Sequence, residues 1–360
     1  MAEVTKEQIE AAIKGYIEPH MEKNLVDAKC VKAMNIDGGS VSVTVELGFP
    51  SDGIKQALAA AVKDCVASVD GVSSVDVNVG WKVVAHSVQK SLKPIDNVKN
   101  IIAIASGKGG VGKSTTAVNM ALALAAEGAK VGILDADIYG PSQPRMLGVS
   151  GQPESKDGKS LEPMEAYGLQ AMSIGFLVDE ETPMIWRGPM VTQALEQLLN
   201  DTNWASLDYL IIDLPPGTGD TQLTLAQKVP VSGAVIVTTP QDIALLDARK
   251  GFKMFEKVEV PVLGIVENMS THICSNCNHE EHIFGEGGGK RMAEQYGVDF
   301  LGGLPLDIRI REETDGGKPT VVAEPDSRIS QIYREISRNT TAKLALQAKN
   351  YASKFPNIVT

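Results

Sequence analysis

The sequence predicts a doubly wound α/β domain with a mostly parallel sheet, preceded by a small α+β domain. Beyond about residue 100, continuous apolar runs alternate with helical patterns, as they do where strands are buried on both faces of a parallel sheet. One of these runs leads directly into a glycine-rich loop and then a helix. Before about residue 85, the strand patterns alternate apolar and polar side chains, which is typical of strands with one solvated face.

Composition restricts the classes of function that the chain can have. Its 360 residues suffice for two domains, and its net charge of −11 disfavours nonspecific binding to nucleic acid, which requires clustered lysine and arginine. The N-terminus lacks the basic start and apolar core of a signal peptide, and no apolar run approaches the roughly 20 residues that span a membrane. We therefore expect a cytoplasmic protein that binds neither nucleic acid nor a membrane.

Residues 1–85 are expected to form the small α+β domain. Apolar side chains at helical spacing predict one helix near the N-terminus and a second over 53–68. Segments 41–47 and 73–79 alternate as half-buried strands do, and the turn before 41–47 implies another strand ahead of it. The predicted order of elements is therefore α-β-β-α-β.

The second domain is expected over residues 100–360, after a polar linker at 86–99 that contains proline. Its predicted strands are the apolar runs IIAIAS, VGILDAD, YLIIDLPP, GAVIVTTP, PVLGIVENM and VDFLGGLP. Ligands of doubly wound folds bind at the carboxyl ends of the strands. Functional residues are therefore expected where these runs end.

The segment GKGGVGKS, residues 107–114, satisfies the pattern G-x-x-x-x-G-K-[ST] between a predicted strand and a predicted helix. Its glycines allow successive backbone N–H groups to close around phosphates, and the helix N-terminus adds positive potential. Lys113 is expected to reach the β- and γ-phosphates, and the Ser114 hydroxyl to hold Mg²⁺. The predicted nucleotide contacts are Gly107, Lys108, Gly109, Gly110, Val111, Gly112, Lys113, Ser114 and Thr115.

Two acidic strand ends complete the predicted nucleotide site. Asp135 and Asp213 each end an apolar run, where a carboxylate can hold Mg²⁺ through water. Asp137 is expected to orient the attacking water, although a solvated turn residue would give the same pattern. Asp220, in the glycine-rich segment that follows Asp213, is a further candidate.

The loop GKGGVGKS resembles the deviant phosphate loop of the MinD, ParA, ArsA and NifH group of ATPases. In that group the additional early lysine crosses a dimer interface and contacts the nucleotide of the partner. The resemblance implies that Lys108 acts in this way in a homodimer, as an arginine finger does in other enzymes. Lys108, Lys113 and Asp137 would then be the catalytic residues. From the residues alone, Lys108 could equally be a solvated loop lysine.

Further segments between residues 95 and 325 narrow the similarity to one subfamily. These segments are DADIYGPS, MSIGFL, IWRGPM, DYLIIDLPPGTGD, TTPQDIALLDARKG, GIVENMS, IFGEGGG and LGGLPLDIRIRE. They resemble the Mrp/ApbC family of iron–sulfur cluster carriers. The resemblance implies ATP, Mg²⁺ and a [4Fe-4S] cluster as bound groups, with apo iron–sulfur proteins and cluster scaffold proteins as partners. It also implies that Asn268 lies near the adenine, and it marks Trp186, Arg187 and Gly188 as a family hallmark without a derivable role.

Cys274 and Cys277 form a C-x-x-C pair just after a predicted strand. Among four cysteines in a chain without an export signal, such a pair is more typical of a metal or redox site than of a disulfide. Two thiolates are only half of the four ligands of a cubane cluster, and the sequence has no second pair. A symmetric dimer brings two such pairs together at its axis, which completes the ligand count.

Other assignments of the cysteine pair stay open. His272, His279 and His282 flank it, so a zinc site of cysteine and histidine within one chain is conceivable, as is thiol chemistry. Asn278 follows the pair where the family usually has glycine. Asparagine tolerates a left-handed backbone better than most residues, so the loop is expected to keep its conformation.

The first 85 residues resemble the iron–sulfur assembly domain that is often fused ahead of these ATPases, on the segments YIEPHMEKNLV and DGVSSVDVNV. That domain commonly carries a cysteine before its second helix, but the corresponding stretch, LGFPSDGIK, has none. We therefore expect this domain to contact proteins rather than bind metal. Cys30 and Cys65 are expected to be buried as small apolar side chains.

The C-terminal segment 329–352 predicts one long helix. It lacks the strong aromatic and leucine face of a membrane-targeting helix, so we expect it to pack on the domain. The leading hypothesis is an ATP-binding, slowly hydrolysing homodimer that assembles a labile cluster on the shared cysteine pairs and transfers it to apo-proteins. The alternative is a positioning ATPase of MinD or ParA type, with a zinc-bound or structural C-x-x-C pair.

Overall fold

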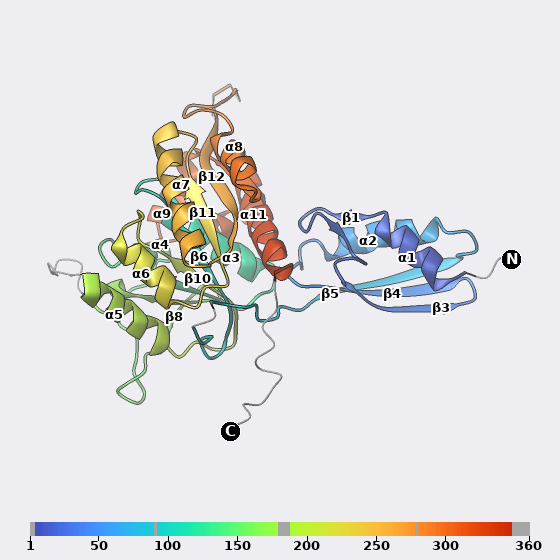
Figure 1. The fold of residues 1–360 in the computed structure, drawn as a ribbon, viewed down its shortest axis with the longest axis horizontal. Helices are drawn as coiled ribbons and strands as arrows, with labels where there is room; N and C mark the ends of the chain where they lie inside the picture. Colours follow the sequence, from blue (N-terminus) through green and yellow to red (C-terminus); the bar gives the residue numbers. More distant parts are fainter. Residues whose placement is uncertain (1–3, 90–91, 179–187, 275, 278, 348–360) are drawn as a thin grey trace.

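The computed structural model describes residues 4–89, 92–178, 188–274, 276–277 and 279–347. Figure 1 shows a small part built from α1 to β5, which extends to the right of a larger part built around a central sheet. The larger part has the mostly parallel sheet, flanked by helices, that the sequence predicts. The predicted fold class is therefore confirmed.

The small part contains a three-stranded sheet. Its order is β3 (Val31–Asp37), β4 (Ser40–Leu47), β5 (Ser74–Trp81), with β3 antiparallel and β5 parallel to β4. In β4 the buried residues alternate with half-buried ones, as the apolar–polar alternation predicts. A short antiparallel pair that the sequence does not predict, β1 (Ile17–Glu18) with β2 (Lys23–Asn24), lies apart from this sheet.

Two helices pack with this sheet around one core. In α1 (Lys6–Lys14) the buried residues are Ile9 and Ile13, one helical turn apart. Thr5 caps the helix with its side chain, which accepts a hydrogen bond from the backbone of Gln8, as in a capping box. α2 (Lys55–Ala67) connects β4 to the parallel strand β5, because a parallel pair requires a crossover.

The central sheet of the described residues has nine strands. Their order is β13-β12-β11-β6-β10-β7-β9-β8, and β14 also pairs with β12. The pairs β8–β9 and β12–β13 are antiparallel, whereas the others are parallel. The strands are β6 (Val98–Ala105), β7 (Val131–Asp135), β8 (Met164–Ala166), β9 (Leu169–Ser173), β10 (Leu207–Asp213), β11 (Gly233–Thr238), β12 (Val262–Ile273), β13 (Glu280–Glu281) and β14 (Phe300–Pro305).

The six predicted apolar runs become β6, β7, β10, β11, β12 and β14. The sequence pattern does not predict β8, β9 and β13, which are too short to show a clear period. β6 begins at Val98, within the segment 86–99 that the sequence predicts as a linker. At its start, the backbone N–H of His86 donates to the side-chain oxygen of Asn100 at 3.0 Å, which ties this segment to the sheet.

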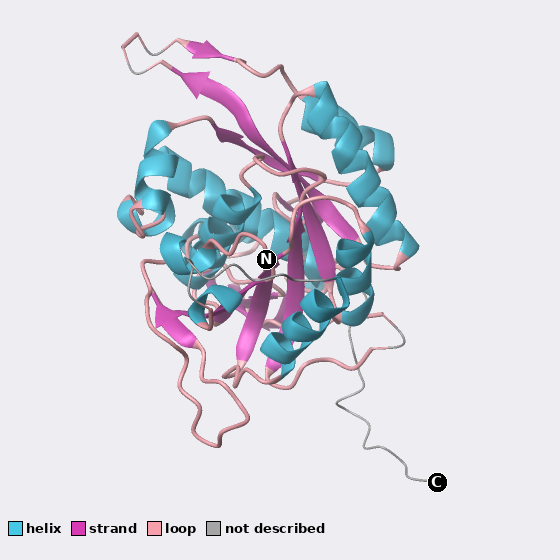
Figure 2. Ribbon diagram, turned by 90° about the vertical axis from the view of Figure 1, so that its left-hand side faces the viewer, coloured by secondary structure: helices cyan, strands magenta, loops and turns pink. Residues whose placement is uncertain are grey.

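Helices cover both faces of the central sheet (Figure 2). Ile102 and Ile104 of β6 contribute to one core, whereas Ile101 and Ala103, which point the other way, contribute to a second. The helices are α3 (Lys113–Ala126), α4 (Gln143–Met146), α5 (Gly188–Asn200), α6 (Asp220–Lys228), α7 (Asp242–Lys257), α8 (Gly288–Tyr296), α9 (Ile308–Asp315), α10 (Thr320–Ala323) and α11 (Arg328–Ala345), with a 3₁₀ turn η1 (Ile174–Phe176). α3 and α11 pack in the first core, and α5, α6 and α7 in the second.

The C-terminal helix packs on the domain, as expected. Ile329, Tyr333, Ile336 and Leu344 of α11 are buried in the core that α3 also lines. Within the described part of the chain, no helix is both long and apolar enough to cross a membrane. Residues 348–352 of the predicted helix lie outside the described residues.

A buried ion pair at the end of α3 contacts the small part through a hydrogen bond. The fully buried Glu127 follows the last residue of α3, and its carboxylate pairs with the guanidinium of Arg338 on α11. The same carboxylate accepts a hydrogen bond of 2.8 Å from the backbone N–H of Gly53 in the small part. Asp52, next to Gly53, accepts a 2.7 Å hydrogen bond from the indole of Trp81. The helix that starts at the predicted phosphate loop therefore ends against the small part.

His20 extends this charged contact. Its ring nitrogens lie 2.6 Å from Glu18 and 2.9 Å from Glu335, and Glu335 also pairs with Arg338 at 2.8 Å. Burial alone would lower the pKa of His20, but its hydrogen bonds to Glu18 and Glu335 outweigh burial and raise the pKa to about 9. The imidazole is therefore a cation at neutral pH and forms an ion pair with Glu335 between the two parts.

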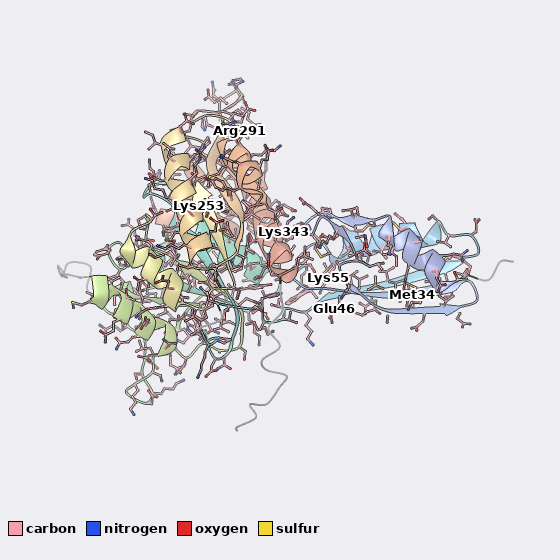
Figure 3. The ribbon with its side chains drawn as sticks, viewed as in Figure 1. Met34, Glu46, Lys55, Lys253, Arg291 and Lys343 are labelled. Atoms are coloured by element: carbon pink, nitrogen blue, oxygen red, sulfur yellow. The ribbon has the colours of Figure 1, made fainter. Side chains whose placement is uncertain are left out.

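Lys343, near the end of α11, adds a third ionic contact at this junction (Figure 3). Its ammonium lies 3.1 Å from Glu22 in the small part and 2.9 Å from Asp299 in the larger part. The junction is thus held by charged groups from the small part, α3 and α11 together.

Replacing Arg338 with leucine should destabilise the protein by about 3–5 kcal/mol, because Glu127 would be left buried without its partner. The free energy of unfolding can be measured by urea denaturation. The matched control is Lys253→Met, which breaks a pair with Glu256 in which both side chains are 58% exposed, and should cost less than about 1 kcal/mol. Equal costs for the two variants would contradict a buried ion pair at the junction.

Candidate functional site

The predicted phosphate loop lies between β6 and α3, and its glycines are required by its geometry. Gly110 and Gly112 both have φ of +80°, a left-handed conformation that side chains rarely adopt. A Cβ atom at Gly112 would lie 2.1 Å from the side-chain nitrogen of Asn268. A Cβ atom at Gly107 would lie 2.1 Å from the backbone carbonyl carbon of Asp247 on α7. The loop is therefore fitted closely between β12 and α7.

An open cavity of about 260 Å³ lies against this loop. Its walls come from the loop, the first turn of α3, the segment after β7 and the segment after β10. The lining residues are Ser106, Lys108, Gly109, Gly110, Gly112, Lys113, Ser114, Thr115, Asp137, Gly140, Ser142, Met146 and Pro216. Most of the predicted nucleotide contacts thus face one cavity at the carboxyl ends of the strands.

Lys113 takes part in a buried ion pair. Its ammonium pairs with the carboxylate of Asp213 and lies 3.1 Å from the Ser114 hydroxyl. Lys113 is 6% exposed and Asp213 is not exposed at all. Because a buried ammonium requires a partner, Asp213 holds Lys113 in place beside the cavity.

Asp135 lies next to Asp213, because β7 and β10 are neighbours in register. Its carboxylate accepts backbone hydrogen bonds from Asp137 (3.1 Å), Ser142 (2.8 Å) and Gln143 (3.0 Å). Burial and the nearby negative charge of Asp213 nevertheless raise the pKa of Asp135 to about 7. Two buried carboxylates therefore crowd together with one lysine.

This cluster fits Mg²⁺. Asp135 and Asp213 offer hard oxygen ligands beside the Ser114 hydroxyl, and their repulsion is what a divalent cation would relieve. Asp137 lines the cavity, and its pKa is raised mainly by burial, with Asp213 adding to the effect and Lys113 opposing it. The structure thus brings the predicted acidic residues to the same strand ends as the phosphate loop.

Gln143 also belongs to this cluster, although the sequence analysis does not single it out. It is 1% exposed, and its side-chain nitrogen donates to Asp213 (3.0 Å) and to the backbone oxygen of Ser114 (3.2 Å). The sequence signal was the serine and proline on either side of it, which favour the start of a helix. A helix start shortly after the acidic end of β7 was therefore a signal for placing Gln143 near Asp135.

Asn268 braces the phosphate loop from β12. Its side-chain nitrogen donates to the backbone oxygen of Val111 at 2.9 Å. The next residue, Met269, has φ of +55°, and the register between β12 and β14 shifts after Glu267. The adenine contact expected of Asn268 stays a prediction.

Lys108 lines the cavity from the opposite end of the loop to Lys113. Its backbone oxygen accepts a 2.9 Å hydrogen bond from the Ser106 hydroxyl, which fixes its place in the loop. Its side chain is half-buried, and it forms no salt bridge with any residue that the structure describes. No acidic side chain among the described residues therefore neutralises the charge of Lys108 through a salt bridge.

Cys274 and Cys277 lie at the tip of a β-hairpin. β12 continues beyond Asn268 to Ile273 and pairs with β13, and the backbone N–H of Cys274 donates to His279 at 2.9 Å. The pKa of Cys274 is lowered by hydrogen bonds from the backbone N–H of Asn276, the backbone N–H of Cys277 and the Cys277 thiol. These bonds favour the thiolate, which is the form that binds metal.

The flanking histidines do not complete a metal site in the described structure. His272 hydrogen-bonds the backbone oxygen of Leu306 at 3.1 Å, and His282 that of Ser270 at 2.8 Å. Within the described residues, no group of three or more His, Cys, Asp or Glu side chains could hold a metal ion. A zinc site that uses both cysteines and a histidine of one chain is therefore not assembled there.

The remaining candidates lie elsewhere. Cys30 is buried, as expected, whereas Cys65 is only half-buried and is not among the buried residues of α2, which are Leu58, Val62 and Val66. Trp186, Arg187 and Asn278 lie outside the described residues, as does the side chain of Asp220.

Comparisons with known proteins agree with these features. A family model described as NUBPL iron-transfer P-loop NTPase matches residues 97–341, and one described as iron–sulfur cluster assembly protein matches residues 6–79. An iron–sulfur cluster carrier protein of Pseudomonas fragi is 61% identical over 76% of this chain and 96% of its own. The carrier protein of that name from Escherichia coli K12 is 49% identical over 96% of this chain and 94% of its own.

Two solved structures show the same fold. A nucleotide-binding protein of Archaeoglobus fulgidus, in complex with ADP, is 39% identical, with a TM-score of 0.57 over 64% of this chain and 90% of its own. The cell division ATPase MinD of Pyrococcus furiosus is 22% identical, with a TM-score of 0.50 over 67% of this chain and 97% of its own. The second likeness supports the fold alone.

Replacing Gly112 with alanine should destabilise the nucleotide-free protein by about 1–3 kcal/mol, because the left-handed backbone would be strained and Asn268 displaced. Thermal unfolding without nucleotide measures this effect. Gly109→Ala is the matched control in the same loop, since a Cβ atom there meets nothing within 4 Å, and should change stability by less than about 0.5 kcal/mol. If both variants melt alike, the loop is not held against β12 as described.

Proposed function

Because this chain belongs to the family of NUBPL-type iron-transfer P-loop NTPases, we propose that it is an ATP-hydrolysing homodimer that carries an iron–sulfur cluster to apo-proteins. The resemblance to the Mrp/ApbC carriers is confirmed by these matches. The observation that carries the proposal is that one chain holds both a phosphate loop that lines a cavity and a pair of free thiols, of which Cys277 is exposed and Cys274 has a lowered pKa.

The nucleotide chemistry follows from the cluster at the strand ends. Lys113 and the loop N–H groups would bind the β- and γ-phosphates, while Ser114, with Asp135 and Asp213 through water, would hold Mg²⁺. Bound Mg²⁺ neutralises the charge that develops on the phosphates. Asp137 would accept a hydrogen bond from the water that attacks the γ-phosphorus as the bond to the β-phosphate oxygen breaks.

Lys108 is proposed to act on the nucleotide of the second copy. It lines the open cavity, and among the described side chains none pairs with its charge. A cation supplied by the partner makes hydrolysis depend on dimer formation, as with an arginine finger supplied in trans. Slow turnover in the free chain would then be a consequence of its being a monomer.

The iron–sulfur cluster is the cargo and is proposed to lie between two chains. Cys274 and Cys277 supply two thiolates, and the same pair of the second copy supplies the other two. The four cysteines are free, as is typical of a reducing compartment, and the cytoplasm is the proposed place of action. Apo iron–sulfur proteins and cluster scaffolds are the proposed partners, and residues 1–85 the proposed module for contacting them.

β12 offers a direct path between nucleotide and cluster. Its residue Asn268 bonds the phosphate loop, and Cys274 follows six residues further along the same strand and its hairpin. A shift of the phosphate loop on ATP binding would therefore displace β12 and with it the cysteine pair. Coupling of about 1–3 kcal/mol would change cluster affinity roughly 5- to 150-fold, enough for loading or release.

Replacing Lys108 with alanine should leave ATP binding intact but slow hydrolysis by about 10³- to 10⁵-fold, because the charge supplied across the dimer is lost. Steady-state kcat and the ATP dissociation constant would be measured together. Lys159→Ala, in an exposed loop, is the control and should match the unaltered protein. Hydrolysis at the normal rate in Lys108→Ala would make Lys108 a solvated loop residue.

Cys277→Ala should abolish cluster assembly, because one of the two thiolates of each chain is removed. After anaerobic reconstitution, iron and sulfide analysis should give about two of each per chain in the unaltered protein and almost none in the variant. Cys65→Ala, in the small part, should keep the full content. Stoichiometric zinc without sulfide would instead favour the positioning ATPase with a structural cysteine pair.

A further inference from the structure

Two buried oxygen atoms at the start of α4 have no hydrogen-bond partner among the described residues. They are the hydroxyl oxygen of Ser142 and the side-chain oxygen of Gln143. Ser142 lines the nucleotide cavity, and Gln143 is 1% exposed beside it. A buried oxygen without a donor is costly, so the neighbourhood of these two atoms is suited to a group that donates hydrogen bonds.

The carboxamide of Gln143 has a defined orientation. Both hydrogens of its nitrogen are used, one toward Asp213 and one toward the backbone oxygen of Ser114. The reverse orientation would place its oxygen against the carboxylate of Asp213, where two acceptors would repel each other. The oxygen is therefore the free end of the amide.

The backbone at the start of α4 holds the carboxylate of Asp135. The N–H groups of Ser142 and Gln143 donate to Asp135 at 2.8 and 3.0 Å. Gln143 thereby contacts both aspartates and the first turn of α3. Its side chain contacts Ser114 and Asp213, which lie 29 and 70 residues away in the sequence.

We propose that Ser142 and Gln143 position the hydrated Mg²⁺ of the nucleotide, with the Ser142 hydroxyl and the Gln143 side-chain oxygen accepting hydrogen bonds from metal-bound water. Mg²⁺ gives up its water reluctantly and is usually bound through several of its waters, which are strong donors. The Gln143 nitrogen meanwhile donates hydrogen bonds to Asp213 and to the backbone oxygen of Ser114, and so positions Asp213 beside the start of α3. Gln143 is thus a positioning residue that acts on the cation through water and through Asp213.

This inference rests on the proposed function only in so far as the protein binds a magnesium nucleotide. Partners that orient a metal's ligands typically change metal affinity 10- to 100-fold when removed. The readout is therefore the affinity for Mg²⁺ itself, independent of turnover. It is obtained as the Mg²⁺ concentration that half-maximally tightens the binding of ADP.

Gln143→Met preserves the volume of the side chain but removes both its hydrogen bonds and its free oxygen. We expect the half-maximal Mg²⁺ concentration to rise about 10- to 100-fold, with ADP affinity in EDTA unchanged within about twofold. The control is Gln170→Met, which also removes two side-chain hydrogen bonds, one donated to Ala205 and one accepted from it, but on β9 away from the aspartates. The control should show the Mg²⁺ dependence of the unaltered protein.

Ser142→Ala keeps the test decisive if Gln143→Met does not fold, since it removes a single oxygen atom that has no partner in the described structure. It should raise the half-maximal Mg²⁺ concentration in the same direction by a smaller factor. An unchanged Mg²⁺ requirement in a folded variant would overturn the inference. Loss of ADP binding in EDTA by Gln143→Met would also overturn it, by showing that the residue shapes the phosphate loop instead. Failure of the unaltered protein to bind ADP at all would count against the proposed function, not against Gln143.

Discussion

One chain offers two thiolates at the tip of the β12–β13 hairpin, whereas a cubane cluster takes four ligands. His272 and His282 nearby are hydrogen-bonded to backbone oxygens, and no third ligand joins the pair in the described structure. A second copy of the chain is the simplest source of the missing ligands. The same second copy would bring Lys108 to the other nucleotide, so one assembly would serve both the cargo and the hydrolysis that regulates it.

Two elements of the fold, α3 and β12, connect the phosphate loop to the small part and to the cysteine hairpin. α3 begins at the phosphate loop and is followed by Glu127, which pairs with Arg338 and accepts a hydrogen bond from the small part. β12 contacts the same loop through Asn268 and leads into the hairpin that carries the cysteines. A displacement of the loop can therefore reach both the cargo and the small part through rigid elements. Such elements carry coupling only if each has two arrangements.

The sequence predicts those features whose structure depends on a short, continuous segment of the chain. The phosphate loop is recognisable because glycine and lysine at fixed spacing impose its backbone, and the long buried strands because their apolar runs exceed what a loop would carry. Edge strands β8 and β13 have two or three residues and no period to detect. The role of Gln143 and the Glu127–Arg338 pair depend on contacts across 70 and 211 residues, which only the folded chain brings together. The continuation of β12 to Ile273 is not predicted, because the segment after Asn268 contains the polar residues Ser270, Thr271 and His272.

The central claim is that two chains share one cluster, and a native mass spectrum of the anaerobically reconstituted protein tests it most directly. The predicted species has the mass of two chains plus a single four-iron, four-sulfide cluster, and separates into cluster-free single chains when the cluster is removed by a chelator in the absence of nucleotide. Single chains that each retain a complete cluster, or that each carry one zinc ion, would contradict it.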